Sequence, residues 1–220
     1  MRENDVARLL QISGTIEGLQ EPISSLLRML FLRNDGRVRG PAIFLDRDGV
    51  INVRRPDDYV LDWSQFDFFP GIREALKELS RLHLPMIVIS NQSAVGKGLL
   101  KPRTLESITK EMYRRLCADG APLSAVYYCP HRADENCVCR KPRPGLLLEA
   151  AADFNIDLAR SVFVGDSETD LQAARAAGCN PIFFDSNRIV RTVSGASGID
   201  APVAQTAEQL VRVVERLFQG

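Results

Sequence analysis

Asp46 and Asp48 stand two positions apart in the segment FLDRDGVIN, directly after a short apolar run. D-x-D-G sequences also occur in ordinary surface turns, but an apolar run of the kind that forms a buried strand leads into this one. Closely spaced carboxylates suit Mg²⁺, which prefers oxygen ligands and keeps open positions for water or phosphate. We therefore expect these two residues to form part of a magnesium site at the end of a strand.

A second polar segment, SNQSAVGKG, begins with Ser90 and Asn91 after another apolar run. Its hydroxyl and backbone N–H groups are of the kind that cradle phosphate oxygens. Gly96 and Lys97 do not form a nucleotide-binding P-loop, because a glycine follows the lysine and none stands five positions before Gly96. The segment therefore predicts phosphate binding of another type.

Four potential metal ligands crowd into one array, C-x-H-x5-C-x-C, formed by Cys129, His131, Cys137 and Cys139. Three thiolates and one imidazole complete the tetrahedral shell of a structural Zn²⁺ and leave no position for a reacting water. Buried or idle cysteines are the alternative, but an odd total of 5 cysteines, with three clustered, favours a metal over disulfides. We expect the zinc to fold this loop rather than to take part in a reaction.

Two further charged segments follow. Arg140, Lys141 and Arg143 come directly after the cysteine array, which would fix their direction, so they favour phosphate recognition over a solvated charge run. Asp166 and Asp170 lie in the segment GDSETD after a later apolar run. Taken alone this segment is typical of a helix cap. On a strand parallel to the first one, Asp166 would instead supply a third metal carboxylate.

The polar segments follow apolar runs that alternate with helical patterns. Helical spacing occurs at 72–82, 105–116 and 207–218, the last after a loop-rich stretch from 185 to 204. This alternation indicates an α/β fold in which helices flank a parallel sheet. Open sheets of this class place their sites at the carboxyl ends of the strands, where these polar segments stand. The five apolar runs are 42–45, 86–89, 125–128, 162–164 and 182–184.

The first forty residues differ from the rest of the chain. Their apolar positions, 6, 9, 10, 16, 19, 23, 26, 27, 30 and 31, are spaced as in two amphipathic helices. We expect residues 1–40 to form a helical extension of a domain that spans residues 41–220. The helices would pack on that domain or form an oligomer contact, and Met29 is an alternative start of the chain.

Charge and hydropathy exclude several classes of partner. The 28 Lys and Arg residues balance the 28 Asp and Glu residues, so no global field attracts nucleic acid or a membrane surface. No apolar run approaches the roughly 20 residues that span a bilayer, and the N-terminus lacks the pattern of a secretory signal. We therefore expect a cytoplasmic protein.

The four motifs, taken in order, resemble those of the haloacid dehalogenase (HAD) superfamily of phosphotransferases. The resemblance covers roughly residues 41–185 and rests on the sequences DRDGVIN, SNQS, CPH with C-x-C-R-K-P, and G-D-x-x-x-D. The zinc array narrows it to a group of heptose bisphosphate phosphatases and histidinol-phosphatases. It implies a Rossmann-like fold with a minimal cap and a zinc-binding loop.

The same resemblance implies a role for each residue. Asp46 would attack phosphorus to form an aspartyl phosphate, and Asp48 would protonate the leaving oxygen and later deprotonate the hydrolytic water. Mg²⁺ would be held by Asp46, the backbone carbonyl of Asp48, and Asp166, with Asp170 behind them. The other contacts would come from Ser90, Asn91 and Lys141 to the transferring phosphoryl group and from Arg140, Asn52 and Tyr59 to the rest of the substrate.

The resemblance implies a phosphatase acting on a small phosphorylated sugar, with D-glycero-D-manno-heptose 1,7-bisphosphate as the expected substrate. Histidinol phosphate is the alternative substrate, and a non-catalytic zinc-bearing binding module is the alternative from another class. A phosphatase acting on nucleic-acid ends is disfavoured because the chain is neutral and has no basic stripe. The segment VRRPDDYV after Asn52 is longer and more basic than the corresponding loop of typical members, so Arg54 or Arg55 would reach a second phosphate.

Overall fold

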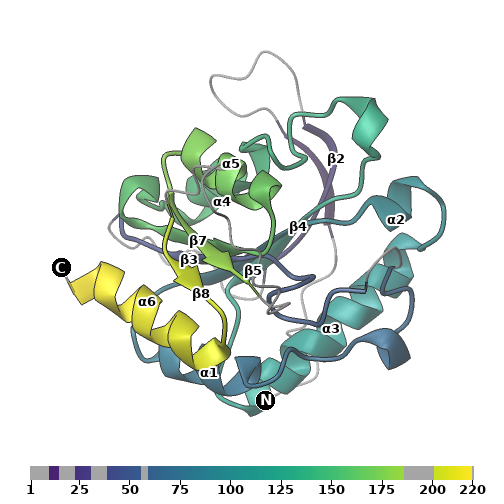
Figure 1. The fold of residues 1–220 in the computed structure, drawn as a ribbon. Helices are drawn as coiled ribbons and strands as arrows, with labels where there is room; N and C mark the ends of the chain where they lie inside the picture. Colours follow the sequence, from purple (N-terminus) through teal and green to yellow (C-terminus); the bar gives the residue numbers. More distant parts are fainter. Residues whose placement is uncertain (1–9, 15–22, 31–38, 56–58, 186–200, 220) are drawn as a thin grey trace, which may run out of the picture.

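The computed structural model describes residues 10–14, 23–30, 39–55, 59–185 and 201–219. Over these ranges it contains one eight-stranded sheet with helices on both faces (Figure 1). The strands are β1 Leu10–Gly14, β2 Ile23–Leu30, β3 Ile43–Leu45, β4 Met86–Asn91, β5 Ala125–Cys129, β6 Val162–Gly165, β7 Asn180–Phe184 and β8 Val203–Ala204. The α-helices are α1 Ile72–Ser80, α2 Ser93–Gly96, α3 Pro102–Ala118, α4 Gly145–Phe154, α5 Glu168–Ala176 and α6 Ala207–Gln219. Short 3-10 helices occupy Trp63–Gln65, Ala133–Glu135 and Leu158–Arg160.

The strand order in the described sheet is β1-β2-β5-β4-β3-β6-β7-β8. Within this order, each neighbouring pair in the run β5-β4-β3-β6-β7-β8 is parallel. All five strands predicted from the apolar runs belong to this run. The fold is therefore the α/β fold expected from the sequence. In this order β3, which leads to Asp46, lies between β4 and β6, so three of the predicted polar segments meet at neighbouring strand ends.

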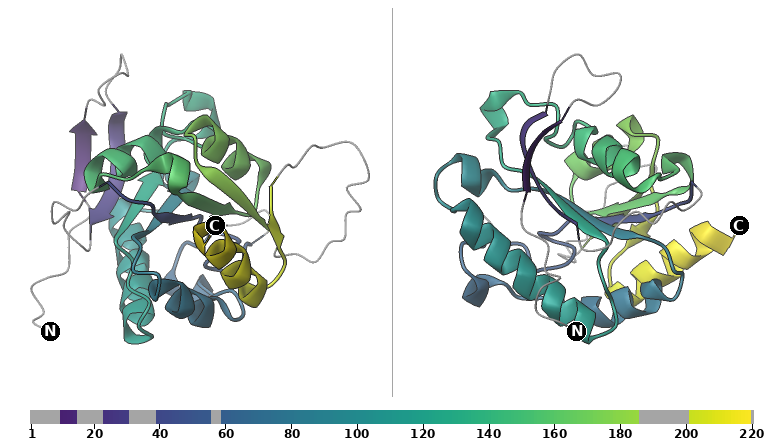
Figure 2. Two further views of the ribbon diagram at one scale, coloured as in Figure 1. Left: turned by 90° about the vertical axis from the view of Figure 1, so that its left-hand side faces the viewer. Right: turned by 180° about the vertical axis from the view of Figure 1, so that it is seen from behind.

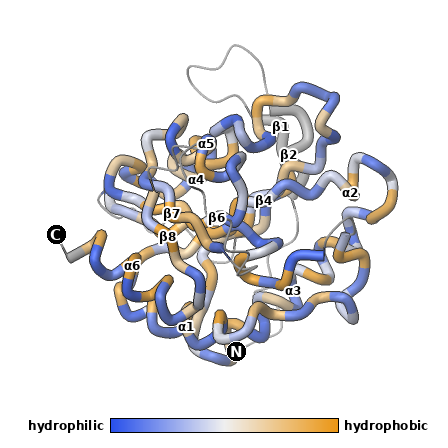
Figure 3. The backbone as a smooth tube through the Cα atoms, in the orientation of Figure 1, coloured by the Kyte–Doolittle hydropathy of each residue, from blue (hydrophilic) through white to orange (hydrophobic). Residues whose placement is uncertain are grey.

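Two apolar layers cover the sheet, one on each face. Side chains of a strand point alternately to its two faces, so Ile43 and Leu45 pack into one layer and Phe44 into the other. The first layer lies under α1, α3 and α6, and the second lies under α4 and α5. Figure 3 shows the apolar residues concentrated along the central strands. Burial on both faces explains why these strands are continuous apolar runs rather than alternating sequences.

The helices follow from their apolar spacing. In α1 the buried residues Ile72, Ala75, Leu76 and Leu79 form one stripe, and α6 packs beside this helix (Figure 2). Helix α3 begins with Pro102 in its first turn, where the missing N–H of proline costs no hydrogen bond. Among the described residues, no helix is long and apolar enough to cross a bilayer.

The expectation of N-terminal helices is wrong for the described part of residues 1–40. Residues 10–14 and 23–30 form β1 and β2, which pair antiparallel, and β2 also pairs antiparallel with β5 (Figure 2). The apolar positions 23, 26, 27 and 30 fit a helix, but as a strand this segment satisfies the outer backbone edge of β5. Leu27 then packs in the layer under α3, while Arg28 on the other face pairs with Glu149 and Asp153 of α4.

The remaining expectations about the N-terminal segment stay predictions. Residues 1–9, 15–22 and 31–38 lie outside the described ranges. The division at residue 40, an oligomer contact and a start at Met29 are therefore open to experiment.

Candidate active site

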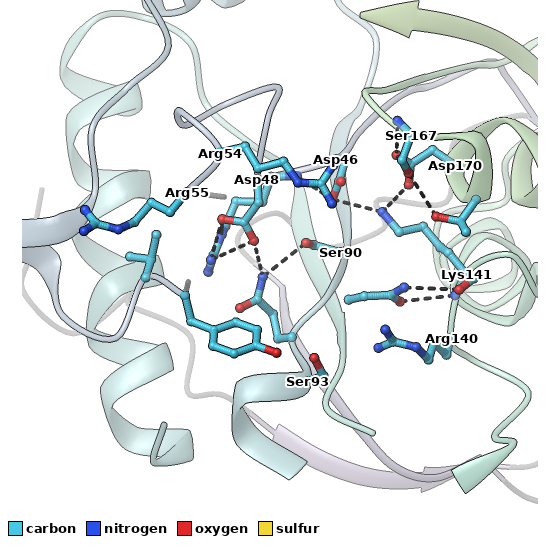
Figure 4. Close-up of a pocket in the computed structure, with 16 residues that line it drawn as sticks. Asp46, Asp48, Arg54, Arg55, Ser90, Ser93, Arg140, Lys141, Ser167 and Asp170 are labelled. Carbon is cyan, nitrogen blue, oxygen red and sulfur yellow. Dashed lines mark hydrogen bonds and ion pairs between the residues drawn. The ribbon is translucent and has the colours of Figure 1, made fainter. Parts of the chain in front are cut away.

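A cavity of about 290 Å³ opens at the carboxyl ends of β3 and β4 (Figure 4). It combines acidic, basic and hydroxyl side chains from segments that are far apart in the sequence. In Figure 4, Asp48 lies on one side of Ser90, and Lys141 and Asp170 lie on the other. The lining residues are Asp46, Arg47, Asp48, Arg54, Arg55, Tyr59, Val60, Ser90, Asn91, Gln92, Ser93, Arg140, Lys141, Ser167, Thr169 and Asp170.

Lys141 is the buried cation of the site. Its Nζ atom lies 2.9 Å from Oδ1 of Asp46 and 2.6 Å from Oδ1 of Asp170, and it donates to the carbonyl of Ile89 at 3.0 Å. Burial opposes the charge, but the two carboxylates outweigh that cost and raise the pKa of Lys141 above its usual value. The ammonium group is therefore a fixed positive charge beside Asp46.

Three carboxylates, those of Asp46, Asp166 and Asp170, form what we call the carboxylate cluster. Each offers an oxygen that lies within 4.8 Å of the others. Burial raises the pKa of Asp46 to about 7, with Lys141 opposing this rise and the neighbouring carboxylates adding to it. Burial likewise raises the pKa of Asp166 to about 6, although Arg54, 2.8 Å from its Oδ2 atom, opposes the shift. The cluster thus concentrates negative charge that the protein neutralises only in part.

The carboxylate cluster fits a hard divalent cation. The Oδ1 atom of Asp166 is buried and has no hydrogen-bond partner among the described residues. An unpartnered buried oxygen is costly unless an ion or water satisfies it. A cluster of carboxylate oxygens at the edge of an open cavity is the donor set that Mg²⁺ prefers. The carboxylate of Asp170 belongs to this set of possible ligands, whereas from the sequence we expected Asp170 to support the ligands without binding the ion.

Two glycines allow the carboxylates to approach the strand ends. Gly49 has φ +98°, and a Cβ atom there would lie 1.9 Å from Oδ2 of Asp166. A Cβ atom on Gly165 would lie 2.2 Å from the Cβ of Asp170. The glycines of D-x-D-G and of G-D-x-x-x-D are therefore needed for the close packing of Asp166 and Asp170.

Asp48 is held apart from the carboxylate cluster by donors on its own side. Arg47 donates to both of its oxygens, at 2.8 and 2.9 Å from Nη2, and Gln92 donates to Oδ2 at 2.8 Å. Burial alone would raise the pKa of Asp48, but the charge and hydrogen bonds of Arg47, with those of Asn52 and Gln92, hold it below its usual value. These donors thus favour the carboxylate form of Asp48, whose exposed edge faces the cavity.

Asn52 does not occupy the substrate-contacting position that we expected. Its side chain is fully buried, lies outside the cavity lining, and donates to Oδ1 of Asp48 at 3.0 Å and to the carbonyl of Val53 at 3.0 Å. A side chain with no exposed surface supports Asp48 rather than reaching a ligand. The turn after Gly49 folds back on Arg47, whose carbonyl accepts from the N–H groups of Ile51 and Asn52, and that reversal directs Asn52 inward.

Ser90 and Asn91 have different environments although they are adjacent. Ser90 is the last buried residue of β4, and its Oγ lies 3.2 Å from Nε2 of Gln92, at the cavity floor. Asn91 pairs with the backbone of Lys141 in both directions, donating to its carbonyl at 3.2 Å and accepting from its N–H at 3.1 Å. Asn91 therefore positions Lys141.

Tyr59 and Arg140 both line the mouth of the cavity, as expected for contacts to the rest of a substrate. Nζ of Lys97, at the end of α2, donates to the Tyr59 hydroxyl at 2.8 Å. This hydrogen bond joins the loop after Asn52 to α2. Arg140 donates from Nη1 to the carbonyl of His131 at 3.2 Å. That bond ties the Arg140 guanidinium to the loop that carries the cysteine array.

The structure brings the four residues of the cysteine array together, and we call them the cysteine cluster. Sγ of Cys129 lies 3.6 Å from Sγ of Cys137 and 3.5 Å from Nδ1 of His131, and Cys139 lies 3.5 and 3.2 Å from the same two atoms. Ligands at about 2.3 Å from a tetrahedral zinc are separated by about 3.8 Å, so these separations fit a closed zinc site. Cys129 ends β5, so an ion bound here would anchor the loop to the sheet.

Sequence reasoning missed Arg47, Gln92 and Ser93 as residues of the cavity. Arg47 and Gln92 stand beside recognised motif residues, so adjacency was the available signal. Both side chains donate hydrogen bonds to Asp48, but the sequence does not predict which way the turns that carry them face.

This chain is similar to several heptose bisphosphate phosphatases of known name. A D-glycero-β-D-manno-heptose-1,7-bisphosphate 7-phosphatase of Vibrio cholerae is 38% identical over 181 residues, which cover 79% of this chain and 90% of that protein. The enzyme of the same name from Escherichia coli K12 is 40% identical over 144 residues, covering 62% of this chain and 74% of that protein. The crystal structure of a D,D-heptose 1,7-bisphosphate phosphatase from Bordetella bronchiseptica, complexed with magnesium and phosphate, matches with a TM-score of 0.73 and 32% identity, covering 80% of this chain and 98% of that one.

The family description covers most of the chain and all the motifs described above. The haloacid dehalogenase-like hydrolase family matches residues 16–178, a range that contains the carboxylate cluster, Asp48, Lys141 and the cysteine cluster. This protein therefore belongs to the haloacid dehalogenase-like hydrolases.

Proposed function

We propose that this protein is a Mg²⁺-dependent phosphatase that removes the 7-phosphate of D-glycero-β-D-manno-heptose 1,7-bisphosphate through an aspartyl phosphate. One observation carries the proposal: a buried lysine and the carboxylates of Asp166 and Asp170 surround Asp46 at the floor of a cavity whose mouth bears arginines. The relatives of that name, up to 40% identical in the cited comparisons, support the choice of substrate.

The carboxylate cluster would hold the magnesium ion. Asp46 and Asp166 would bind it through side-chain oxygens, the backbone carbonyl of Asp48 would add a third ligand, and Asp170 lies close enough to contribute. When bound, Mg²⁺ supplies charge that neutralises the oxygens of the transferring phosphoryl group. The buried Oδ1 atom of Asp166, which has no hydrogen-bond partner among the described residues, supports a bound cation at this place.

In the first step Asp46 attacks phosphorus, and the bond from phosphorus to the ester oxygen breaks. Asp48 takes part in this step in its protonated form and gives its proton to the leaving oxygen, so the sugar departs as an alcohol. The proton that Asp48 takes from water in the second step restores this form. Lys141 neutralises the charge of the phosphoryl oxygens and Ser90 orients them. The charge of Lys141, 2.9 Å from Asp46, also favours the ionised form of that carboxylate. Asn91 contributes by holding the backbone of Lys141.

In the second step water cleaves the aspartyl phosphate. The Asp48 carboxylate takes a proton from the water as the water oxygen bonds to phosphorus. The bond between phosphorus and Asp46 then breaks, which releases inorganic phosphate and restores the Asp46 carboxylate. Splitting the displacement into two steps lets one pair of carboxylates serve both.

The cationic mouth of the cavity would select a second phosphate. Arg140 faces the cavity from the loop of the cysteine cluster, and Arg54 and Tyr59 face it from the loop after Asn52. Lys141 is already engaged with two carboxylates, so the remote phosphate would fall to the arginines. An arginine can bind phosphate through two parallel hydrogen bonds. A zinc ion in the cysteine cluster would fix Arg140 without entering the reaction.

The decisive experiment compares substrates with purified protein and Mg²⁺. We expect kcat/KM for the β anomer of the heptose 1,7-bisphosphate to exceed that for histidinol phosphate by at least about tenfold. Phosphorus NMR of the product should show that the ester at C7 is lost and the one at C1 is kept. A higher kcat/KM for histidinol phosphate than for both heptose anomers would favour histidinol-phosphatase activity instead. Absence of turnover with every phosphate ester would favour a binding module.

A small phosphorylated metabolite as the partner, and no nucleic acid or membrane, accords with the balanced charge of the chain. Cytoplasmic location and assembly through the N-terminal segment belong to the same proposal. Size-exclusion chromatography with light scattering of the full chain and of a chain starting at Met29 would test the assembly.

A further inference from the structure

Arg47 is a fully buried charge that the mechanism above does not use. It is only 1% exposed, and its guanidinium carbon lies 5.9 Å from the centre of the Tyr128 ring on β5. The Tyr128 hydroxyl is in turn 3.0 Å from Oγ1 of Thr109 on α3. A buried arginine destabilises the fold unless an opposite charge and hydrogen bonds satisfy it.

The geometry around Asp48 shows what Arg47 does. Nε and Nη2 of Arg47 contact Oδ1 of Asp48 at 3.2 and 2.8 Å, and Nη2 also contacts Oδ2 at 2.9 Å. Asn52 adds a donor to Oδ1 from the buried side, and Gln92 adds one to Oδ2 from the cavity side. Rotation of the Asp48 side chain would break all of these contacts at once.

We propose that Arg47 is a positioning residue that fixes the Asp48 carboxylate for proton transfer, with Oδ2 as the transferring atom and Gln92 as its exchangeable partner. Oδ2 is assigned because Gln92 lines the cavity, whereas Asn52 on the Oδ1 side is fully buried. Gln92 also lies 3.2 Å from Oγ of Ser90, so it has a second partner when water or the leaving oxygen occupies its place on Oδ2. The inference rests on the proposed phosphatase function.

The two chemical steps depend on Asp48 to different degrees. Departure of a sugar oxygen needs a proton from Asp48, but departure of a dinitrophenolate does not, because that anion is stable. Hydrolysis of the aspartyl phosphate needs Asp48 in both cases, since the attacking water must lose a proton to it. A misplaced Asp48 should therefore spare the first step with an activated aryl ester and slow the second.

Arg47→Lys is the test, because lysine keeps the charge and loses the fork. With 2,4-dinitrophenyl phosphate and Mg²⁺, stopped-flow should show a burst of about one dinitrophenolate per active site at a rate within about threefold of wild type. The steady rate that follows should fall by roughly 30- to 100-fold. Turnover of the heptose bisphosphate should fall by a similar factor in kcat with little change in KM. Gln92→Met, which is isosteric, should show the same pattern with a smaller loss.

Arg73→Lys is the matched control, because Arg73 forms a similar two-bonded pair with Asp119, at 2.6 and 2.7 Å, outside the cavity lining. It should leave burst and turnover unchanged. Equal losses in burst rate and steady rate for both Arg47→Lys and Gln92→Met would overturn the inference, because the Asp46 centre as a whole would then be disturbed. Unchanged turnover in both variants would also overturn it. A wild-type protein that cleaves none of these esters would instead refute the proposed function, and this inference with it.

Discussion

The carboxylate cluster and the cysteine cluster lie near the same edge of the sheet but satisfy their chemical groups differently. The carboxylate cluster opens to a cavity. Among the described residues, the cations that balance it are Lys141 and the half-exposed Arg54, which lies 2.8 Å from Asp166. The groups of the cysteine cluster face one another, with sulfur and nitrogen atoms 3.2 to 3.6 Å apart. The first arrangement can exchange cations and anions with solvent, while the second is complete once one ion binds.

This difference supports a catalytic role for the carboxylate cluster and a structural role for the cysteine cluster. An ion in the carboxylate cluster keeps positions for phosphate and water, so its removal should stop turnover and leave the fold in place. An ion in the cysteine cluster has four protein ligands and joins β5 to the segment that carries Arg140 and Lys141. Its removal should loosen that segment, so stability and activity should be lost together.

The largest effect is expected for Asp46→Asn, which removes the nucleophile from the carboxylate cluster. An amide is too weak a nucleophile to form the phosphoenzyme, so kcat should fall by about 1,000-fold or more. The melting temperature should not fall, because the change removes one negative charge from a crowded group. Steady-state kinetics and scanning calorimetry measure the two properties. Near wild-type kcat in a homogeneous sample would contradict covalent catalysis by Asp46.

The second prediction is that Cys137→Ser affects the fold as well as the reaction. A serine hydroxyl is a poor zinc ligand, so zinc should fall from about one ion per chain to well below it. We expect a loss of about 3 kcal/mol, or roughly 6 to 12 °C in melting temperature, together with most of the activity. Elemental analysis and calorimetry provide the measurements.

Cys117→Ser serves as the matched control for Cys137→Ser, because Cys117 lies on α3 outside the cysteine cluster. It should keep the zinc, the melting temperature and the activity. Wild-type protein without zinc, after expression with zinc under reducing conditions, would be evidence against the closed site.

The sequence was sufficient to predict the cysteine cluster and two members of the carboxylate cluster, Asp46 and Asp166, for a physical reason. Asp46, Ser90 and Asp166 each follow a buried apolar strand, and the carboxyl ends of neighbouring parallel strands meet at one edge. The cysteine cluster is local in sequence, so spacing alone indicated a shared ion. In both cases the functional side chains lie at or directly after the strand that positions them.

The parts that the sequence did not predict depend on contacts between distant segments. The apolar spacing of residues 23–30 fits a helix as well as a strand, and only the free edge of β5 decides between them. Asn52 is polar and follows a turn, so its position in the sequence predicts an exposed side chain rather than one that packs inward against Asp48. The burial of Arg47 against Tyr128 likewise joins a turn to a strand more than eighty positions away.

The third prediction tests the cavity mouth that distinguishes the carboxylate cluster from the closed cysteine cluster. Arg140→Ala should lower kcat/KM for the heptose bisphosphate by about ten- to hundredfold, because a charge-assisted hydrogen bond contributes about 1.5 to 3 kcal/mol. The same variant should hardly change kcat/KM for an aryl phosphate, which has no remote anion for the guanidinium to bind.

Arg143→Ala is the control for Arg140→Ala. Arg143 donates to the carbonyl of Cys137 at 2.6 Å and is absent from the cavity lining. It should leave the ratio of the two kcat/KM values unchanged. An equal loss on both substrates for Arg140→Ala would show that Arg140 supports the loop rather than the substrate.

The smallest expected effect is a pH-dependent stability that belongs to the carboxylate cluster alone. Without Mg²⁺, the pKa values of Asp46 and Asp166 are raised from 3.8 to about 7 and about 6. Between pH 3.8 and these raised values, the folded state therefore binds more protons than the unfolded state. Stability from these groups is present at low pH and is lost as the pH rises through 6 and 7. The Mg²⁺-free melting temperature should therefore fall between pH 5 and pH 8 relative to that of Mg²⁺-loaded protein. Scanning fluorimetry of dialysed samples, with zinc measured to confirm that the cysteine cluster stays loaded, gives the comparison. Asp166→Asn should flatten the difference, since it removes one of the two titrating groups. A Mg²⁺-free melting temperature that tracks the loaded one across this range would mean that the carboxylates are already neutralised within the protein, and the contrast between the two clusters would then fail.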